Sequence, residues 1–174
     1  CYIGGGTVID PASLLSEIDH LLKQGICLQN RLFLSQDAHI VMPYHRLFDQ
    51  WSEEAKGKSA VGTTGKGIGP CYVDKASRSG VRIADFCNPI RFRTVLEAIL
   101  AEKNEEIRKL YDKPPLEFAP IYEAYTEYGK KLLSFIAPVE RLIQEAIKKQ
   151  EVVLLEGAQG ALLDTTFGTY PYVT

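Results

Sequence analysis

The sequence predicts an α/β protein with a mostly parallel sheet and a mainly helical subdomain. Residues 152–155 are all apolar, and such a short continuous run is typical of a strand buried on both faces of a parallel sheet. Residues 31–35 and 39–42 have the composition of two further short strands. The stretch 87–150 carries a helical pattern instead, so we expect it to form the helical subdomain.

The first part of the chain, residues 1–86, is predicted to begin with a helix. Asp10 followed by Pro11 is a typical N-cap and first helical residue. Apolar side chains then recur at the spacing of one buried helix face, and Gly25 ends the helix. This face comprises Leu14, Leu15, Ile18, Leu21 and Leu22. After the two strands, a second helix is expected over residues 43–51.

The remaining elements follow from breakers and caps. A flexible, glycine-rich loop is predicted from about residue 56 to residue 80, with a short strand after it at 81–83. In the helical subdomain Asn88 and Pro89 start a long helix, which Pro114 and Pro115 end. The helices of this subdomain are expected at residues 88–110, 121–135 and 138–149. The last segment, 151–174, is expected to return to the sheet.

Bulk properties exclude several classes of protein. The net charge of the 174 residues is −2, which gives no general attraction for nucleic acid. No apolar run approaches the roughly 18 residues that span a bilayer, so no membrane partner is expected. The cysteines form no C-x-x-C pair and have no ligand spacing with the three histidines, so we expect free thiols in a reducing cytoplasm and no metal site. They are Cys1, Cys27, Cys71 and Cys87.

The most informative segment is 61–78, with the sequence VGTTGKGIGPCYVDKASR. Glycines let backbone N–H groups approach a ligand, threonine hydroxyls donate to phosphate oxygens, and lysine and arginine supply positive charge. We interpret the segment as a phosphate-binding loop, with an unliganded glycine-rich turn as the alternative. It is not a Walker A loop of the form G-x-x-x-x-G-K-[ST], because Gly67 follows Lys66 where Ser or Thr is required. The other register, Gly57-Lys58-Ser59, lacks the first glycine.

A second candidate binding segment follows the apolar run at 152–155. Glu156 and Gln159 would stand at the carboxyl end of that strand, where open α/β sheets bind ligands. The amide of Gln159 can both donate and accept hydrogen bonds, which suits the edge of a nucleobase. A plain turn is the alternative, and this segment on its own favours it.

Taken together, the two segments resemble the adenylosuccinate synthetase family. The family pattern G-I-G-P-x-Y-x-x-K-x-x-R is met in full from Gly67 to Arg78, and EGAQG…GTYPYVT is met over residues 156–174. Weaker similarity covers IGGGTVIDPASLLSEI and RLFLSQDAHIVMPYH. The resemblance implies a P-loop-NTPase-like sheet and one discontinuous domain of a longer enzyme. The family's guanine-nucleotide loop, its acid–base pair and its aspartate loop would then lie outside this chain.

The resemblance also implies a reaction. The enzyme would be a GTP-dependent ligase that joins IMP and L-aspartate through a C–N bond to form adenylosuccinate, in de novo AMP synthesis. GTP and Mg²⁺ would bind mainly outside this chain, which would hold no metal ligand and would be inactive alone. Two alternatives stay open: another phosphate-binding enzyme that reuses the loop, and a non-catalytic helical interaction module.

Site residues are implied only where this sequence matches the family pattern. Thr64 would hold the 5′-phosphate of IMP, and Thr174 would contact the same phosphate from the other side. Gln159 would contact the hypoxanthine. The residues around Thr64 would form a mobile loop, namely Gly62, Thr63, Gly65, Lys66 and Gly67. Lys66 stands where many members carry arginine, so it keeps the charge but loses the planar fork of donors.

Two basic residues complete the implied site. Arg78 matches the arginine that crosses a two-fold interface into the partner subunit's IMP site, which implies a homodimer with an isologous interface. Lys75 is the lysine of the family pattern and the one candidate catalytic residue in this chain. Its alternative is a surface lysine paired with Asp74 or Asp85. The charged stretch 101–113 is interpreted as a solvated helix face, and the tyrosines at spacing three, Tyr122, Tyr125 and Tyr128, as helix packing.

Overall fold

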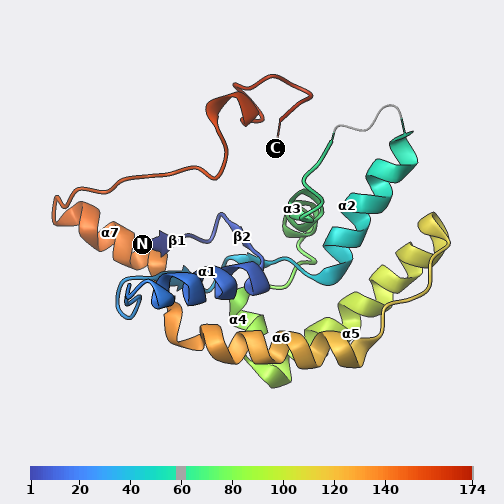
Figure 1. Cartoon of the computed structure of the whole chain (residues 1–174), viewed down its shortest axis with the longest axis horizontal. Coiled ribbons are helices and arrows are strands. Elements are labelled where there is room, and N and C mark those ends of the chain that lie inside the picture. The colour runs from blue at the N-terminus through green and yellow to red at the C-terminus, as the bar shows by residue number, and fades with distance from the viewer. Residues whose placement is uncertain (58–61, 174) are drawn as a thin grey trace.

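The computed structural model describes residues 1–57 and 62–173 (Figure 1). Short strands and helices alternate in the first third of the chain, helices dominate the middle, and the last segment runs in a largely irregular path. The elements are β1 (Tyr2–Ile3), β2 (Val8–Ile9), α1 (Pro11–Lys23), β3 (Phe33–Ser35), β4 (His39–Ile40), α2 (Pro43–Lys56), α3 (Ile68–Ser77), α4 (Ile83–Phe86), α5 (Pro89–Glu106), α6 (Phe118–Leu132), β5 (Ile136–Ala137) and α7 (Val139–Lys148). A π-helical turn, Ile107–Tyr111, extends α5.

The strands are parallel, as the sequence predicts. β3 lies between β1 and β5 in a three-stranded sheet, with Leu34 opposite both Ile3 and Ile136. β2 and β4 form a second parallel pair. The predicted strands at 31–35 and 39–42 correspond to β3 and β4, whereas β1, β2 and β5 are too short to be recognised from periodicity. The α/β fold class is therefore confirmed.

Helix ends follow the capping residues in the sequence. Asp10 Oδ1 accepts hydrogen bonds from the backbone N–H groups of Ala12 and Ser13, at 3.1 and 3.2 Å. Asn88 Oδ1 accepts from Arg91 N at 3.1 Å at the start of α5. These bonds satisfy amides that have no partner inside the helix. The predictions for α1, α5, α6 and α7 are confirmed to within a few residues, and α2 continues past residue 51 to Lys56.

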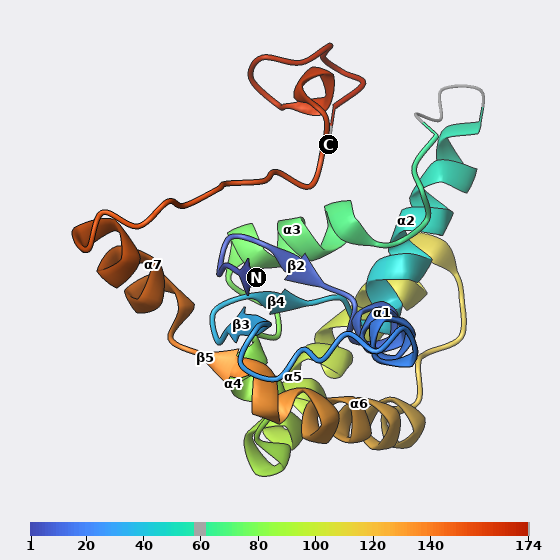
Figure 2. The ribbon, with the colours of Figure 1, turned by 60° about the vertical axis from the view of Figure 1, so that its left-hand side comes forward.

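Helices α4, α5 and α6 pack together beside the strands (Figures 1 and 2). Phe92 of α5 stacks on Tyr122 and Tyr125 of α6, with ring centroids 5.9 and 6.5 Å apart. The Tyr125 hydroxyl donates to the carbonyl of Val41 at 2.9 Å, which ties α6 to the segment after β4. The interpretation of the three regularly spaced tyrosines as packing residues is confirmed.

Two predicted elements between residues 56 and 86 are wrong. A large part of the predicted loop is helical, since α3 occupies Ile68–Ser77. Pro70 is compatible with that helix because it lies in the first turn, where its missing N–H would have no acceptor. The segment at 81–83 forms an isolated bridge between His39 and Arg82 and then helix α4, rather than a strand.

The predicted buried strand at residues 152–155 is also wrong in this structure. The segment has no regular structure, and the side chains of Val152 and Leu154 are 100% and 88% exposed. A strand buried on both faces requires neighbouring strands and covering helices, and no strand of the described residues pairs with this run. The segment instead extends away from α7 and returns above α3 (Figures 1 and 2).

Candidate phosphate-binding site

A cavity of about 350 Å³ lies beside the loop that joins α2 to α3. Gly62, Thr63 and Thr64 line it from the loop, and Tyr172 and Val173 line it from the end of the chain. Two segments more than a hundred residues apart therefore meet at the predicted phosphate-binding loop. They are the same two segments that the sequence singles out.

Acidic side chains of α2 hold the backbone of this loop. Glu53 Oε2 accepts from Gly62 N at 2.8 Å and from Thr63 N at 3.4 Å. Asp49 Oδ2 accepts from Gly67 N at 2.9 Å. A hydrogen bond from Lys56, together with the bond from Gly62 N–H, lowers the pKa of Glu53. These three amides donate inside the protein, so in this arrangement they are not available to a bound phosphate.

Gly67 is required by the geometry of the loop end. Its φ is +74°, a conformation that favours glycine. A Cβ atom at this position would lie 2.7 Å from the backbone atoms His45 C and Arg46 N. The loop end therefore sits directly on the first turns of α2. The motifs of the sequence do not include Asp49 and Glu53, although the i, i+4 spacing of these two residues places both on one face of a helix.

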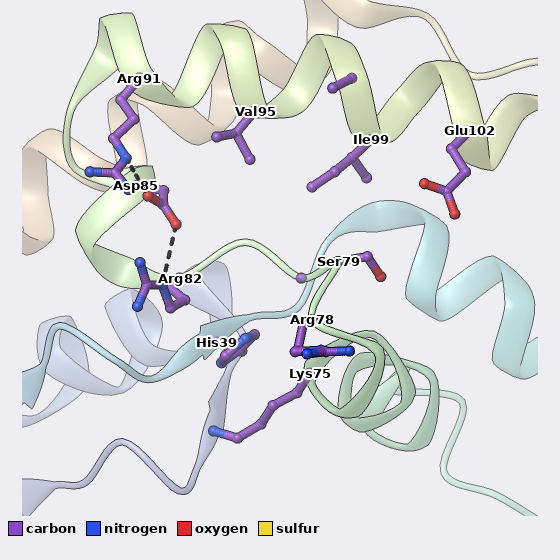
Figure 3. Close-up of a pocket in the computed structure, with 12 residues that line it drawn as sticks. His39, Lys75, Arg78, Ser79, Arg82, Asp85, Arg91, Val95, Ile99 and Glu102 are labelled. Carbon is purple, nitrogen blue, oxygen red and sulfur yellow. Dashed lines mark ion pairs between the residues drawn. The ribbon is translucent and has the colours of Figure 1, made fainter.

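A second cavity, of about 610 Å³, is rich in positive charge (Figure 3). Lys75 donates to the carbonyl of Gly5 and not to Asp74 or Asp85, so the alternative of a surface ion pair for this lysine is wrong. Arg78 is exposed and ends α3 with a φ of 65°. Four further basic or polar residues line the cavity, namely His39, Ser79, Arg82 and Arg91. Arg82 and Arg91 both pair with Asp85, at 3.5 and 2.5 Å.

The predicted site residues fall in three places. Thr64 lines the cavity beside the loop, whereas Lys75 and Arg78 lie together in the basic cavity. Gln159 lines a third cavity, of about 220 Å³, that the last segment forms from its own residues. Thr174 lies outside the described residues, although its neighbour Val173 lines the cavity of Thr64. The structure thus does not bring Gln159 next to Thr64.

A buried polar network joins three helices behind the loop. Asp74 of α3 is 2% exposed, and its Oδ2 lies 3.0 Å from His45 Nε2 of α2. Its Oδ1 accepts from Lys103 Nζ of α5 at 2.7 Å. Lys103 is 7% exposed, so the interpretation of residues 101–113 as a solvated face is wrong at this residue. Burial by itself raises the pKa of Asp74, but the bonds from His45 and Lys103 outweigh it and hold that pKa below its ordinary value.

Within residues 1–57 and 62–173, no group of three or more His, Cys, Asp or Glu side chains is arranged to hold a metal ion. No helix among the described residues combines the length and hydropathy needed to cross a bilayer.

The fold and the loop define a class: an α/β protein with a glycine-rich loop between two helices. The family profile of adenylosuccinate synthetase matches residues 1–174, and the chain belongs to that family. Adenylosuccinate synthetase from Lactobacillus gasseri is 48% identical over 172 residues, which are 99% of this chain and 40% of the relative. The Microcystis aeruginosa enzyme is 49% identical over 174 residues, all of this chain and 39% of the relative.

A solved structure agrees with these sequences. The fully ligated adenylosuccinate synthetase of Plasmodium falciparum matches with a TM-score of 0.82 and 35% identity, over 99% of this chain and 40% of that one. The chain thus spans about 40% of the length of the relatives that it matches. The resemblance deduced from the two motifs is confirmed, and the alternatives of another loop-bearing enzyme or a helical interaction module are not favoured.

Proposed function

We propose that this chain is the part of an adenylosuccinate synthetase that holds the phosphate of IMP. The longer enzyme would be a GTP-dependent ligase that joins IMP and L-aspartate in purine nucleotide synthesis. The observation that carries the proposal is the cavity beside Thr64, which residues 172–173 close from the other side. Thr64 lines this cavity, and its hydroxyl can donate a hydrogen bond to a phosphate oxygen.

The role of this chain in the reaction would be positioning and charge neutralisation. The 6-oxygen of hypoxanthine is a poor leaving group until GTP phosphorylates it, after which the amine of aspartate displaces phosphate. Thr64, Thr174 and the Lys66 ammonium would fix the ribose phosphate, so that the base is presented in one orientation. We assign the principal acid and base, and the GTP and Mg²⁺ sites, to the rest of the enzyme.

Gln159 is proposed to contact the hypoxanthine only after the last segment has rearranged. Its present cavity is separate from that of Thr64. The apolar side chains just before it are exposed, among them Val152 and Leu154. Burying such a run between other strands of the complete enzyme is favourable by about 25 cal/mol per Å² of apolar surface, which supports a different position for residues 156–160 there.

We further propose a homodimer in which Arg78 serves the partner subunit's site. Arg78 is exposed and lies in the basic cavity, away from the Thr64 cavity of its own chain. Lys75 shares that cavity and is the candidate catalytic residue of this chain. A cytoplasmic location is proposed because the four cysteines are all free thiols, as is usual in a reducing compartment.

The test is a reaction assay with the complete enzyme that contains this chain. Adenylosuccinate formation, followed by absorbance, is expected to require IMP, GTP, Mg²⁺ and aspartate together. The 174-residue chain alone is expected to form none. Phosphate release that does not require aspartate would contradict the proposal.

Shared sites can be tested by mixing two defective variants. Thr64→Ala and Arg78→Ala are each expected to lose activity, and an equimolar mixture should recover about a quarter of it. Half of the dimers are then mixed, and each mixed dimer has one site that carries both intact residues. No recovery after subunit exchange would contradict the crossing of Arg78.

A further inference from the structure

We infer that Asp74, which lies between His45 and Lys103, is a positioning residue. It fixes how the end of the glycine-rich loop packs against helix α2. This inference rests on the proposed function for its kinetic consequence, but its structural basis is independent. Asp74 does not line the cavity of Thr64, so it would act through other groups.

The carboxylate of Asp74 bonds to two other helices. Each oxygen of Asp74 has its own partner from a different helix: Lys103 Nζ at 2.7 Å from α5 and His45 Nε2 at 3.0 Å from α2. Two directional bonds to two helices fix both the rotation and the displacement of α3. An apolar contact would not fix them, because it has no preferred direction.

The tautomer of His45 follows from its hydrogen bonds. The backbone N–H of Met42 donates to His45 Nδ1 at 2.9 Å, so Nδ1 is the acceptor and the proton lies on Nε2. Burial lowers the pKa of His45 more than the bond to Asp74 raises it. The imidazole is therefore a neutral donor with a defined tautomer, and the buried ion pair is the one between Asp74 and Lys103.

Helix α2 links this network to the loop. Asp49, one turn after His45 on α2, accepts from Gly67 N, and Gly67 lies against the backbone of residues 45 and 46. The same stretch of α2 thus holds the end of the loop and the middle of α3. A shift of α3 relative to α2 would move Thr64 on one side and Arg78, one turn beyond Asp74, on the other.

A buried ion pair contributes little net stability compared with apolar residues of similar size, but removal of one partner leaves an unpaired buried charge. This difference separates positioning from mere stabilisation. A double variant of the complete enzyme, Asp74→Leu with Lys103→Met, removes both charges and restores an apolar contact. We expect it to fold with a lower melting temperature than the parent, because the buried N–H of His45 Nε2 loses its acceptor. Its KM for IMP is expected to rise by about tenfold or more, with a smaller change in kcat.

The single variants and a control complete the experiment. Asp74→Asn is expected to raise the KM for IMP, since its amide nitrogen would face either Lys103 or His45, both of which are donors. Glu97→Gln removes an exposed ion pair with Arg93 on the same helix as Lys103. This control is expected to leave the KM for IMP, kcat and the melting temperature unchanged. A double variant with the KM of the parent would overturn the inference.

A second readout does not depend on the reaction. Amide hydrogen exchange of the peptide that covers residues 62–71 is expected to quicken in the double variant and not in Glu97→Gln, because a shift of α3 would weaken the bond from Gly67 N–H to Asp49. If the parent enzyme formed no adenylosuccinate, the proposed function would fail while this readout still decided the inference. Unchanged exchange in the folded double variant would overturn it.

Discussion

Replacing Gly67 by alanine tests the contact between the loop and α2. The added Cβ would lie 2.7 Å from His45 C and Arg46 N, both of them backbone atoms of a helix. The helix backbone cannot yield, because its hydrogen bonds hold it, so the loop end must lift. Lifting the loop end would break the 2.9 Å bond from Gly67 N to Asp49.

The magnitude follows from two contributions. A non-glycine residue with positive φ costs roughly 1–2 kcal/mol. Losing a hydrogen bond to a charged acceptor costs about 1.5–3 kcal/mol. Gly67→Ala is therefore expected to lower the free energy of unfolding by about 2.5–5 kcal/mol. Relaxation of the loop would bring the measured value towards the lower end.

The assay is urea unfolding of the complete enzyme, together with the KM for IMP. Gly65→Ala is the matched control, since Gly65 also has positive φ, at +65°, but its Cβ would meet nothing within 4 Å. The control should show only the backbone contribution, so the two variants should differ by at least about 1.5 kcal/mol. If Gly67→Ala lowered the free energy of unfolding no more than Gly65→Ala, the packing of the loop end against α2 would be refuted.

Three further outcomes are expected. Thr64→Ala should raise the KM for IMP by about 10- to 150-fold, the equivalent of 1.5–3 kcal/mol, whereas Thr64→Ser should stay near the parent, and equal defects would show that the hydroxyl is not the phosphate ligand. Burial raises the pKa of the Cys71 thiol to about 12, so iodoacetamide at about pH 8 should label the exposed Cys27 and leave Cys71 unmodified by mass spectrometry; rapid labelling of Cys71 in the folded protein would contradict its burial. Folding lowers the pKa of His45, so the unfolded chain takes up its proton first as pH falls below 6.5. The free energy of unfolding should therefore decrease below that pH and level off beneath the pKa of the folded state. His45→Gln should flatten this pH dependence only in part, since the pKa of His39 shifts in the same direction, and an unchanged pH dependence would show that His45 is not buried in the neutral form.

The sequence by itself determined those features that depend on neighbouring residues. Asp10 and Asn88 cap helices through side-chain bonds that span two or three residues, and periodicity located the long helices because a helix face repeats every few positions. The glycines, threonines and basic residues of the loop, read with the segment at 156–174, sufficed to indicate the family before any contact was known.

The tertiary structure decided what depends on distant partners. Residues 152–155 have the composition of a buried strand, but a strand needs neighbours to pair with, and without them the run is exposed. Lys103 has the sequence context of a solvated helix and is buried, because Asp74 reaches it from 29 residues away. Such a charge can be buried only where the fold supplies an opposite charge. No local sequence pattern predicts the contact between Lys103 and Asp74.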